Sequence, residues 1–160
     1  MKKILLPIVL GGLIIALSGC TLFAKKAKEK DMAAPDEKGN YHYENSDLGF
    51  KVSLSKEFQY YQVQRKNKEE FVDLEFFLPT SDIKYPQEIQ SYGKPMIIRV
   101  YTKEGWDKGA KDNFDKSFKK LSETTTKTYL IKFWKEYPDD WKKRWNKSVE
   151  EGILKSFEAN

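Results

Sequence analysis

The chain has 160 residues, of which 33% are charged and 14% aromatic, and its formal net charge is +5. This length suits one domain with a short additional segment, and 4 Trp, 9 Tyr and 10 Phe suffice for a packed core. The charge is too mild to require an anionic polymer as partner. Cys20 is the only cysteine, which excludes an intramolecular disulfide.

The first residues have the pattern of an export signal. Lys2 and Lys3 precede an apolar run of 13 residues, Ile4 to Ala16, interrupted only by Pro7. A transmembrane helix needs about 20 apolar residues, so this run is too short to span a bilayer comfortably. We therefore predict a signal peptide over residues 1–19.

The signal ends in Leu17-Ser18-Gly19-Cys20, which resembles the lipobox of bacterial lipoproteins. The resemblance implies that Cys20 is lipidated, becomes the first mature residue and anchors the protein to the extracytoplasmic side of a membrane. Thr21 differs from the Asp of an inner-membrane retention signal, which implies the outer membrane in a diderm cell and the plasma membrane otherwise. The alternative is an ordinary signal peptide that contains a cysteine.

Residues 20–40 have no hydrophobic period and carry four lysines in six positions, Lys25 to Lys30. We predict a flexible tether. Lysines so close to the anchor can attract anionic headgroups, by about 1 kcal/mol each, or simply form a solvated spacer. Residues 41–160 are predicted to form one globular domain.

Alternating apolar residues predict several strands in this domain. The clearest runs are Phe50–Val52–Leu54, residues 61–64, residues 72–78 and residues 96–101, and the charged residues 65–70 suggest a hairpin connection. Pro79 ends the third run because it cannot donate to a ladder. Residues 80–95 form a long irregular stretch, and such stretches are often functional. Its Tyr85 and Tyr92 are candidate partner-binding residues, unless their rings only pin the loop to the sheet.

The second half predicts a helix, a strand and a final helix. Residues 105–121 place an apolar stripe on one helical side, and residues 128–134 read as a strand in which Leu130 and Trp134 share a face. The final helix is predicted from Trp141 onward, with Trp145, Val149, Ile153 and Phe157 along its stripe. The stripe of the first helix comprises Trp106, Ala110, Phe114, Phe118 and Leu121.

These elements predict an α+β fold with one mainly antiparallel sheet flanked by helices. Apolar residues on the second sheet face suggest that this face is partly covered too. The stretch from Asp47 to Phe58 and the ending Ile153-Leu154-Lys155-Ser156-Phe157 are similar to the first and last motifs of the PsbP/Mog1-like superfamily, although Ser55 stands where that family has Pro. The resemblance implies an α-β-α sandwich with an accessory or binding role, and no functional residues carry over.

No catalytic or metal-binding pattern stands out. His42 is the only histidine, and any Ser-His-Asp triad or His-based metal site would have to use it. Asp112 with Asp115 and Asp139 with Asp140 form possible carboxylate pairs, but neighbouring lysines make solvated helix faces the better reading. We predict no catalytic residues, no metal and no cofactor.

The basic cluster Lys142-Lys143-Arg144 lies between Trp141 and Trp145, a combination found in nucleic-acid-binding proteins. Both tryptophans belong to the inward-facing stripe, however, so we predict no nucleic-acid partner.

The leading hypothesis is a membrane-tethered, non-enzymatic domain that binds an unidentified envelope protein or ligand. The lipid on Cys20 would attach this domain to the bilayer. One alternative is an envelope hydrolase whose carboxylates are not identifiable from the sequence. Another is a lipoprotein that binds sugar or peptide in an aromatic groove formed by Tyr85, Tyr92 and Trp106. A core or loop-anchoring role for these three aromatic rings is the competing interpretation.

Overall fold

The computed structural model describes residues 34–160. The predicted signal peptide, Cys20 and most of the predicted tether therefore lie outside the described residues. The described part is α+β, and its paired strands are antiparallel, as predicted. Within this part of the chain no helix has the length and apolar character needed to cross a membrane.

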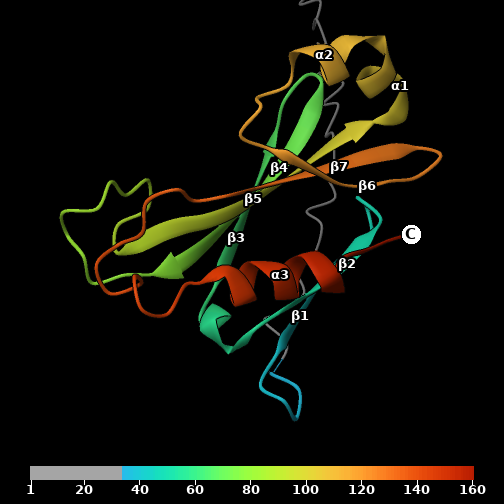
Figure 1. Ribbon diagram of the computed structural model, residues 1–160. Coiled ribbons are helices and arrows are strands. Elements are labelled where there is room, and N and C mark those ends of the chain that lie inside the picture. Colours follow the sequence, from blue (N-terminus) through green and yellow to red (C-terminus); the bar gives the residue numbers. More distant parts are fainter. Residues whose placement is uncertain (1–33) are drawn as a thin grey trace, which may run out of the picture. The chain divides into compact units, whose positions relative to one another are not determined.

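Five strands form the larger sheet, in the order β3-β4-β5-β7-β6 (Figure 1). Leu74, Ile98 and Ile131 lie side by side on its three inner strands, each fully buried. The alternating patterns therefore predicted these three inner strands correctly. The five strands of the sheet are β3 (Gln62–Asn67), β4 (Phe71–Pro79), β5 (Tyr92–Thr102), β6 (Lys119–Glu123) and β7 (Lys127–Phe133).

The prediction of a single sheet is wrong, because β1 (Tyr41–Asn45), β2 (Phe50–Leu54) and β8 (Glu158–Ala159) form a second sheet in the order β1-β2-β8. After β2 the chain enters the 3-10 helix η1 (Lys56–Phe58) and then turns at Tyr60, whose φ is 63°. This turn carries β3 away from β2, and the free side of β2 pairs with the C-terminal strand.

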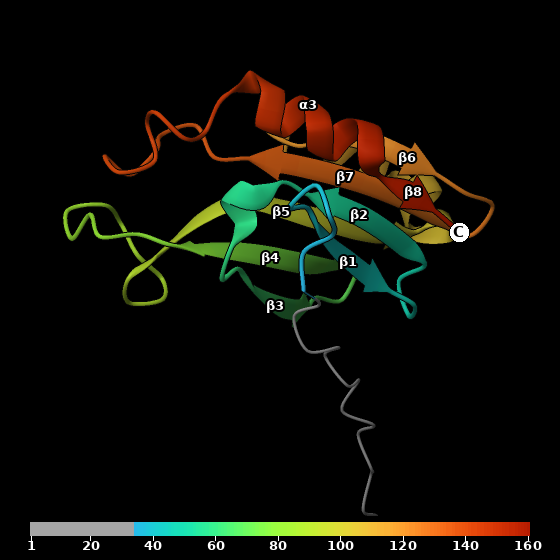
Figure 2. The same cartoon turned by 90° about the horizontal axis from the view of Figure 1, so that it is seen from below.

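The three-stranded sheet and helix α3 (Lys147–Ser156) cover one face of the larger sheet (Figure 2). Phe50, Val52 and Leu54 of β2 and Val149 and Ile153 of α3 belong to one apolar cluster with the inward residues of β4, β5 and β7. The hydroxyl of Tyr129 in β7 donates to the carbonyl of Leu48 at 2.8 Å, which ties the two sheets together.

The second face of the larger sheet is partly covered, as predicted. Tyr101, Trp106, Phe118 and Leu130 form a separate buried cluster on this face, with Phe114 packed against it. Trp134 was predicted to lie there as well. Instead it packs in the first cluster against Trp141 and Trp145, because β7 ends at Phe133 and the chain turns after it.

The helix predicted over residues 105–121 is wrong in its second half. The chain forms three short turns, α1 (Lys103–Gly105), the π-helix η2 (Trp106–Ala110) and α2 (Lys111–Asn113). Gly109 has φ 155°, which breaks helical continuity. Residues 119–123 form β6 because they pair with β7, and residues 124–126 turn the chain between these strands.

The last helix begins six residues later than predicted, at Lys147. The Asn146 side chain accepts from the N–H groups of Ser148 and Val149, at 2.9 and 3.3 Å, and so caps the helix. Trp141 and Trp145 lie in the preceding turns and are nevertheless buried, as the apolar stripe predicted.

Candidate functional site

The loop of residues 80–91 lies against residues 134–146 at one end of the larger sheet (Figure 1). It is shorter than the irregular stretch predicted, because β5 already begins at Tyr92. Two aspartates join the segments in opposite directions. The Asp140 carboxylate accepts from the Thr80 hydroxyl at 2.7 Å and from the Ser81 N–H at 3.0 Å, while the Asp82 carboxylate accepts from the Asp139 N–H at 2.9 Å.

These contacts also favour the ionised carboxylates. The N–H groups of Asp139 and Lys84 lower the pKa of Asp82. Partial burial acts to raise the pKa of Asp140, but hydrogen bonds from Thr80 and Ser81 outweigh it, and this pKa is lowered too. The two segments are therefore held together by charge-assisted hydrogen bonds, which fix the loop backbone.

The three aromatic residues proposed for binding do not form one surface. The Tyr85 ring packs edge-on against Trp134, with centroids 6.3 Å apart, and its hydroxyl donates to the carbonyl of Glu136 at 3.2 Å. Tyr92 lies at the start of β5, and its hydroxyl accepts from the Gln62 side chain on β3 at 2.8 Å. Trp106 is buried beyond the opposite end of β5. Tyr85 thus has the loop-pinning contacts of the competing interpretation.

Ile83 is the large hydrophobic residue that this loop exposes, with 92% of its surface accessible. It sits between Asp82 and Lys84, and the Lys84 N–H donates to the Asp82 carboxylate at 3.0 Å. The sequence contains a signal for this turn, since an Asp that bonds the backbone two residues later forms an Asx-turn. The binding residues predicted in this stretch were Tyr85 and Tyr92, and Ile83 was not among them.

A second feature of this end is a shallow groove of about 490 Å³ between η1 and residues 143–146, hereafter the basic groove. The guanidinium of Arg144 lies over the Trp141 ring, 4.0 Å from its centroid. The remaining charges are two lysines and one glutamate. The lining residues are Lys56, Glu57, Gln59, Lys143, Arg144 and Asn146.

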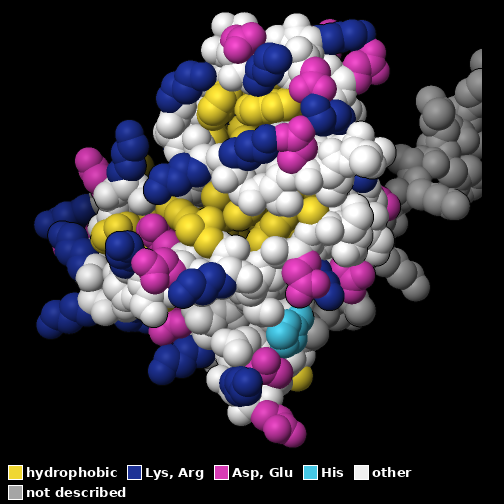
Figure 3. Space-filling view, turned by 45° about the vertical axis from the view of Figure 1, so that its right-hand side comes forward, with side chains coloured by type: hydrophobic (Ala, Val, Ile, Leu, Met, Phe, Trp, Pro, Cys, Tyr) yellow, Lys and Arg dark blue, Asp and Glu magenta, His cyan; other side chains and the backbone are white. Residues whose placement is uncertain are grey.

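A hydrogen-bonded chain joins Asp36, His42 and Ser53 on the outer side of β1 and β2, where the histidine is visible in Figure 3. Asp36 Oδ2 lies 3.1 Å from Nε2, and Ser53 Oγ lies 3.1 Å from Nδ1. A hydrolytic triad has the opposite arrangement, with serine at Nε2 and aspartate at Nδ1.

The surroundings of this chain fit a structural role. The Ser53 N–H donates to the Ser156 hydroxyl at 3.1 Å, so it is already bonded and is not a free oxyanion donor. Asp36 also accepts from the Asn40 N–H at 2.8 Å. The chain therefore fastens the residues before β1 onto β1 and β2.

Across residues 34–160 no three His, Cys, Asp or Glu side chains are arranged to hold a metal ion.

Comparison of the sequence with protein-family models, curated proteins and solved structures gives no match. The resemblance to the PsbP/Mog1-like superfamily therefore gains no support from these comparisons. The site must be interpreted from its own chemistry.

Proposed function

We propose that the protein is a lipid-anchored, extracytoplasmic domain that binds a partner in the cell envelope and has no catalytic role. The observation that supports the anchor is Leu17-Ser18-Gly19-Cys20 directly after a 13-residue apolar run with a basic start. The bilayer is then one partner, held through the lipid on Cys20, and the described domain contacts the other.

The contact surface proposed for that second partner is the tip of the loop of residues 80–91. Burying an isoleucine side chain contributes about 1.5–3 kcal/mol, and Ile83 leaves this contribution unused in the free domain. Because Asp82 and Asp140 already fix the loop, a partner that buries Ile83 has little ordering cost to offset. A hot spot is a side chain that becomes fully buried in a well-packed pocket of the partner, and an exposed apolar side chain on a fixed backbone suits this role.

The hydrolase alternative finds less support in the carboxylates. A general acid needs a raised pKa, whereas hydrogen bonding to Ser117 lowers the pKa of Asp115 to about 2. Asp140 is also shifted downward and holds Thr80 and Ser81. Asp139 forms an ion pair with Lys142 at 2.6 Å. The contacts of Asp115 and Asp140 therefore favour their ionised forms.

The anchor is tested by Cys20→Ser. Loss of the thiol removes the group that accepts the diacylglyceryl unit, so we expect the variant to be unlipidated and retained as an uncleaved precursor. Mass spectrometry of the membrane fraction measures both properties in the native protein and the variant. A native mature chain that is unacylated, or that begins at another residue, would contradict the anchor.

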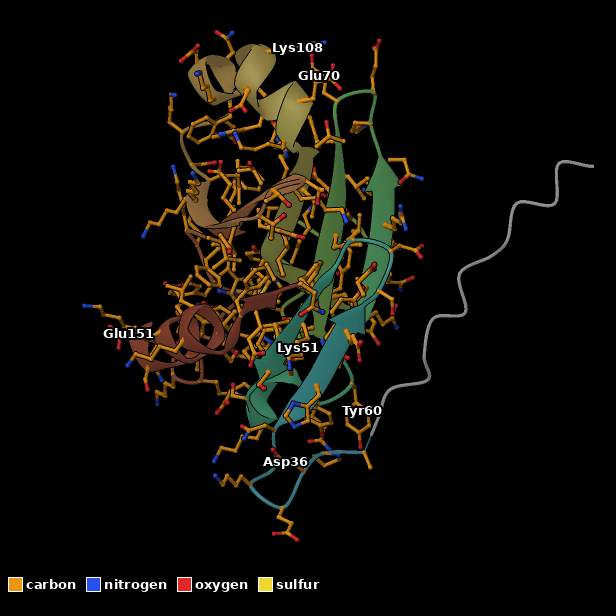
Figure 4. All side chains as sticks on the ribbon, turned by 90° about the vertical axis from the view of Figure 1, so that its right-hand side faces the viewer. Asp36, Lys51, Tyr60, Glu70, Lys108 and Glu151 are labelled. Carbon is orange, nitrogen blue, oxygen red and sulfur yellow. The ribbon has the colours of Figure 1, made fainter. Side chains whose placement is uncertain are left out.

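The partner contact is tested with a photo-crosslinking amino acid at Lys84, beside Ile83. In native envelopes we expect one discrete adduct, which Ile83→Ser removes and Ile83→Val retains. The matched control places the crosslinker at Lys108, an exposed residue beyond the other end of β5. Figure 4 shows Lys108 at the end of the domain that also holds Glu70, away from Asp36 and Tyr60. Equal adducts from both positions, or an adduct that survives Ile83→Ser, would contradict a contact through Ile83.

A further inference from the structure

The basic groove gathers three cations on walls that come from distant parts of the sequence. Lys56 lies on η1, and Lys143 and Arg144 lie in the turns before α3. We infer that this groove is an anion site that binds a phosphate group. The inference does not depend on the lipid anchor or on the contact through Ile83.

Arg144 is held in place before any ligand arrives. Its guanidinium stacks on Trp141, and the backbone N–H of Arg144 donates to the Trp141 carbonyl at 3.0 Å. Trp141 is itself only 1% exposed, and its indole N–H donates to the carbonyl of Pro79 at 2.8 Å. Stacking through its face leaves the edge of the guanidinium to donate two parallel hydrogen bonds, the geometry that suits phosphate.

The opposite wall is fixed through the core. Phe58 of η1 is fully buried, and its ring centroid lies 5.8 Å from that of Trp145. The contact therefore holds the backbone segments that carry Lys56 and Arg144 side by side. Asn146 uses its Oδ1 to cap α3, which leaves its amide NH₂ as a neutral donor at the groove.

The charges of the groove favour a multivalent anion. Among residues 34–160 no carboxylate lies within ion-pair distance of Lys56, Lys143 or Arg144. Glu57 contributes the one carboxylate of the six lining residues. The oxygens of a phosphate group can accept from all three cations at once, whereas a carboxylate has only two oxygens. The mild net charge of the whole chain conceals this local cluster.

The groove is not suited to reading nucleic-acid bases. Base stacking requires an exposed aromatic face, and Trp141 and Trp145, the two rings beside the basic cluster, are 1% and 2% exposed. The phosphate is therefore expected on a headgroup, on a phosphodiester polymer or as the free ion, and these sources share one chemistry.

The test is calorimetric titration of the full chain in neutral detergent micelles. The three probes are inorganic phosphate, a short poly(glycerol phosphate), and bicelles that contain phosphatidylglycerol. Bicelles of phosphatidylcholine alone are the control for the third probe. Arg144→Gln and Lys143→Gln are compared with Lys111→Gln, an exposed lysine on α2 outside the groove. We expect each groove variant to weaken binding at least tenfold, and added salt to weaken it further.

The probe whose binding is lost in the groove variants identifies the source of the phosphate. Because Arg144→Gln also removes the cover of Trp141, urea unfolding is measured in parallel, and Lys143→Gln keeps the test valid if Arg144→Gln unfolds. Absence of binding by all three probes, or equal weakening by Lys111→Gln, would overturn the inference. Lipidation of Cys20 and the adduct at Lys84 are expected to be unchanged in the groove variants, which separates this outcome from the proposed function.

Discussion

The two ends of the larger sheet are closed by segments that are held in different ways. Residues 103–117 cover the end where β5 finishes, and the loop of residues 80–91 extends from the end where β5 begins (Figure 1). The first segment is held by aromatic rings. The second is held mainly by carboxylates that bond the backbone.

At the first end, Trp106 lies between Tyr101 and Phe114, with ring centroids 5.4 and 5.2 Å away. Nearby, Arg99 stands between two further rings, 3.7 Å from the centroid of Phe71 and 4.3 Å from that of Phe118. The Arg99 guanidinium bonds Asp73 through two contacts of 2.8 Å. The contacts between the rings depend on burial and not on a regular backbone. The backbone here can therefore be irregular as long as the rings stay covered.

At the second end, Asp82 and Asp140 bond specific backbone and hydroxyl groups, and such bonds have strict geometry. The contacts fix the path of the loop without covering its tip, which leaves Ile83 exposed. Aromatic closure therefore covers the apolar side chains of a segment, whereas carboxylate closure orders a segment and leaves an apolar side chain exposed. We place partner binding at the second end for this reason.

The largest effect is expected from removing the aromatic anchor of the first end. Trp106→Ala should lower the free energy of unfolding by about 3–5 kcal/mol, the usual range for truncating a buried Trp, because Tyr101 and Phe114 lose their shared contact. Urea unfolding measures the change. Lys108→Ala, two residues along and exposed, should change stability very little. Similar losses in the two variants would mean that the segment is not held by this ring.

A matched pair of glycine substitutions probes the two ends for opposite reasons. At Gly93 an added Cβ would lie 3.0 Å from the Trp134 ring, so Gly93→Ala should cost about 1–3 kcal/mol by overpacking. Gly109 has open space around it but φ 155°, so Gly109→Ala should cost about 1–3 kcal/mol through backbone strain.

Second-site variants distinguish these two causes. Trp134→Phe, which shortens the ring, should recover part of the loss in Gly93→Ala when both variants are measured by thermal unfolding. No shortened neighbour should rescue Gly109→Ala, because no side chain lies close to it. Rescue of both, or of neither, would contradict this assignment.

The sequence predicted the strands whose signal is local. Phe50, Val52 and Leu54 alternate with polar residues and are buried, since alternation follows directly from strand geometry. The second sheet was not predictable in this way. It depends on the turn at Tyr60 and on β8, whose two residues, Glu158 and Ala159, carry no periodic pattern.

The two wrong helix boundaries have a common cause. The apolar spacing correctly identified Trp106, Phe118, Trp141 and Trp145 as buried. Burial of a ring does not require a helix, however, and turns bring the same rings inward. The N-cap signal of Asn146 was present in the sequence, but the aromatic stripe that continued across it dominated the prediction.

The candidate site was predictable in position and not in detail. The irregular stretch after Pro79 was identified from its prolines and tyrosines, while Ile83 became visible only once Asp82 and Asp140 had fixed its loop. The basic groove joins η1 to the turns before α3, and no sequence period relates such distant residues.

The smallest effect is expected at the carboxylate-held end, and it depends on pH. The pKa of Asp140 is below its ordinary value of 3.8 in the folded chain. Its contribution to stability is therefore present above about pH 4 and is lost as the pH falls through the folded pKa. Asp140→Ala removes both acceptor oxygens, so the Ser81 N–H and the Thr80 hydroxyl lose their bonds at all pH values, at a cost of about 1–2 kcal/mol.

Amide hydrogen exchange at Ser81, corrected for the intrinsic pH dependence, measures this contribution directly. Native Ser81 should be protected at pH 6 and lose protection below pH 4, while the variant should be weakly protected throughout. The Lys103 amide is bonded to the Thr126 carbonyl at 2.8 Å, and it serves as the reference at the aromatic end. Asp112→Ala, on exposed α2, is the matched control variant. If native Ser81 and Lys103 lost protection together as the pH fell, the two ends would share one mode of closure, and carboxylate bonding would not be what orders the loop around Ile83.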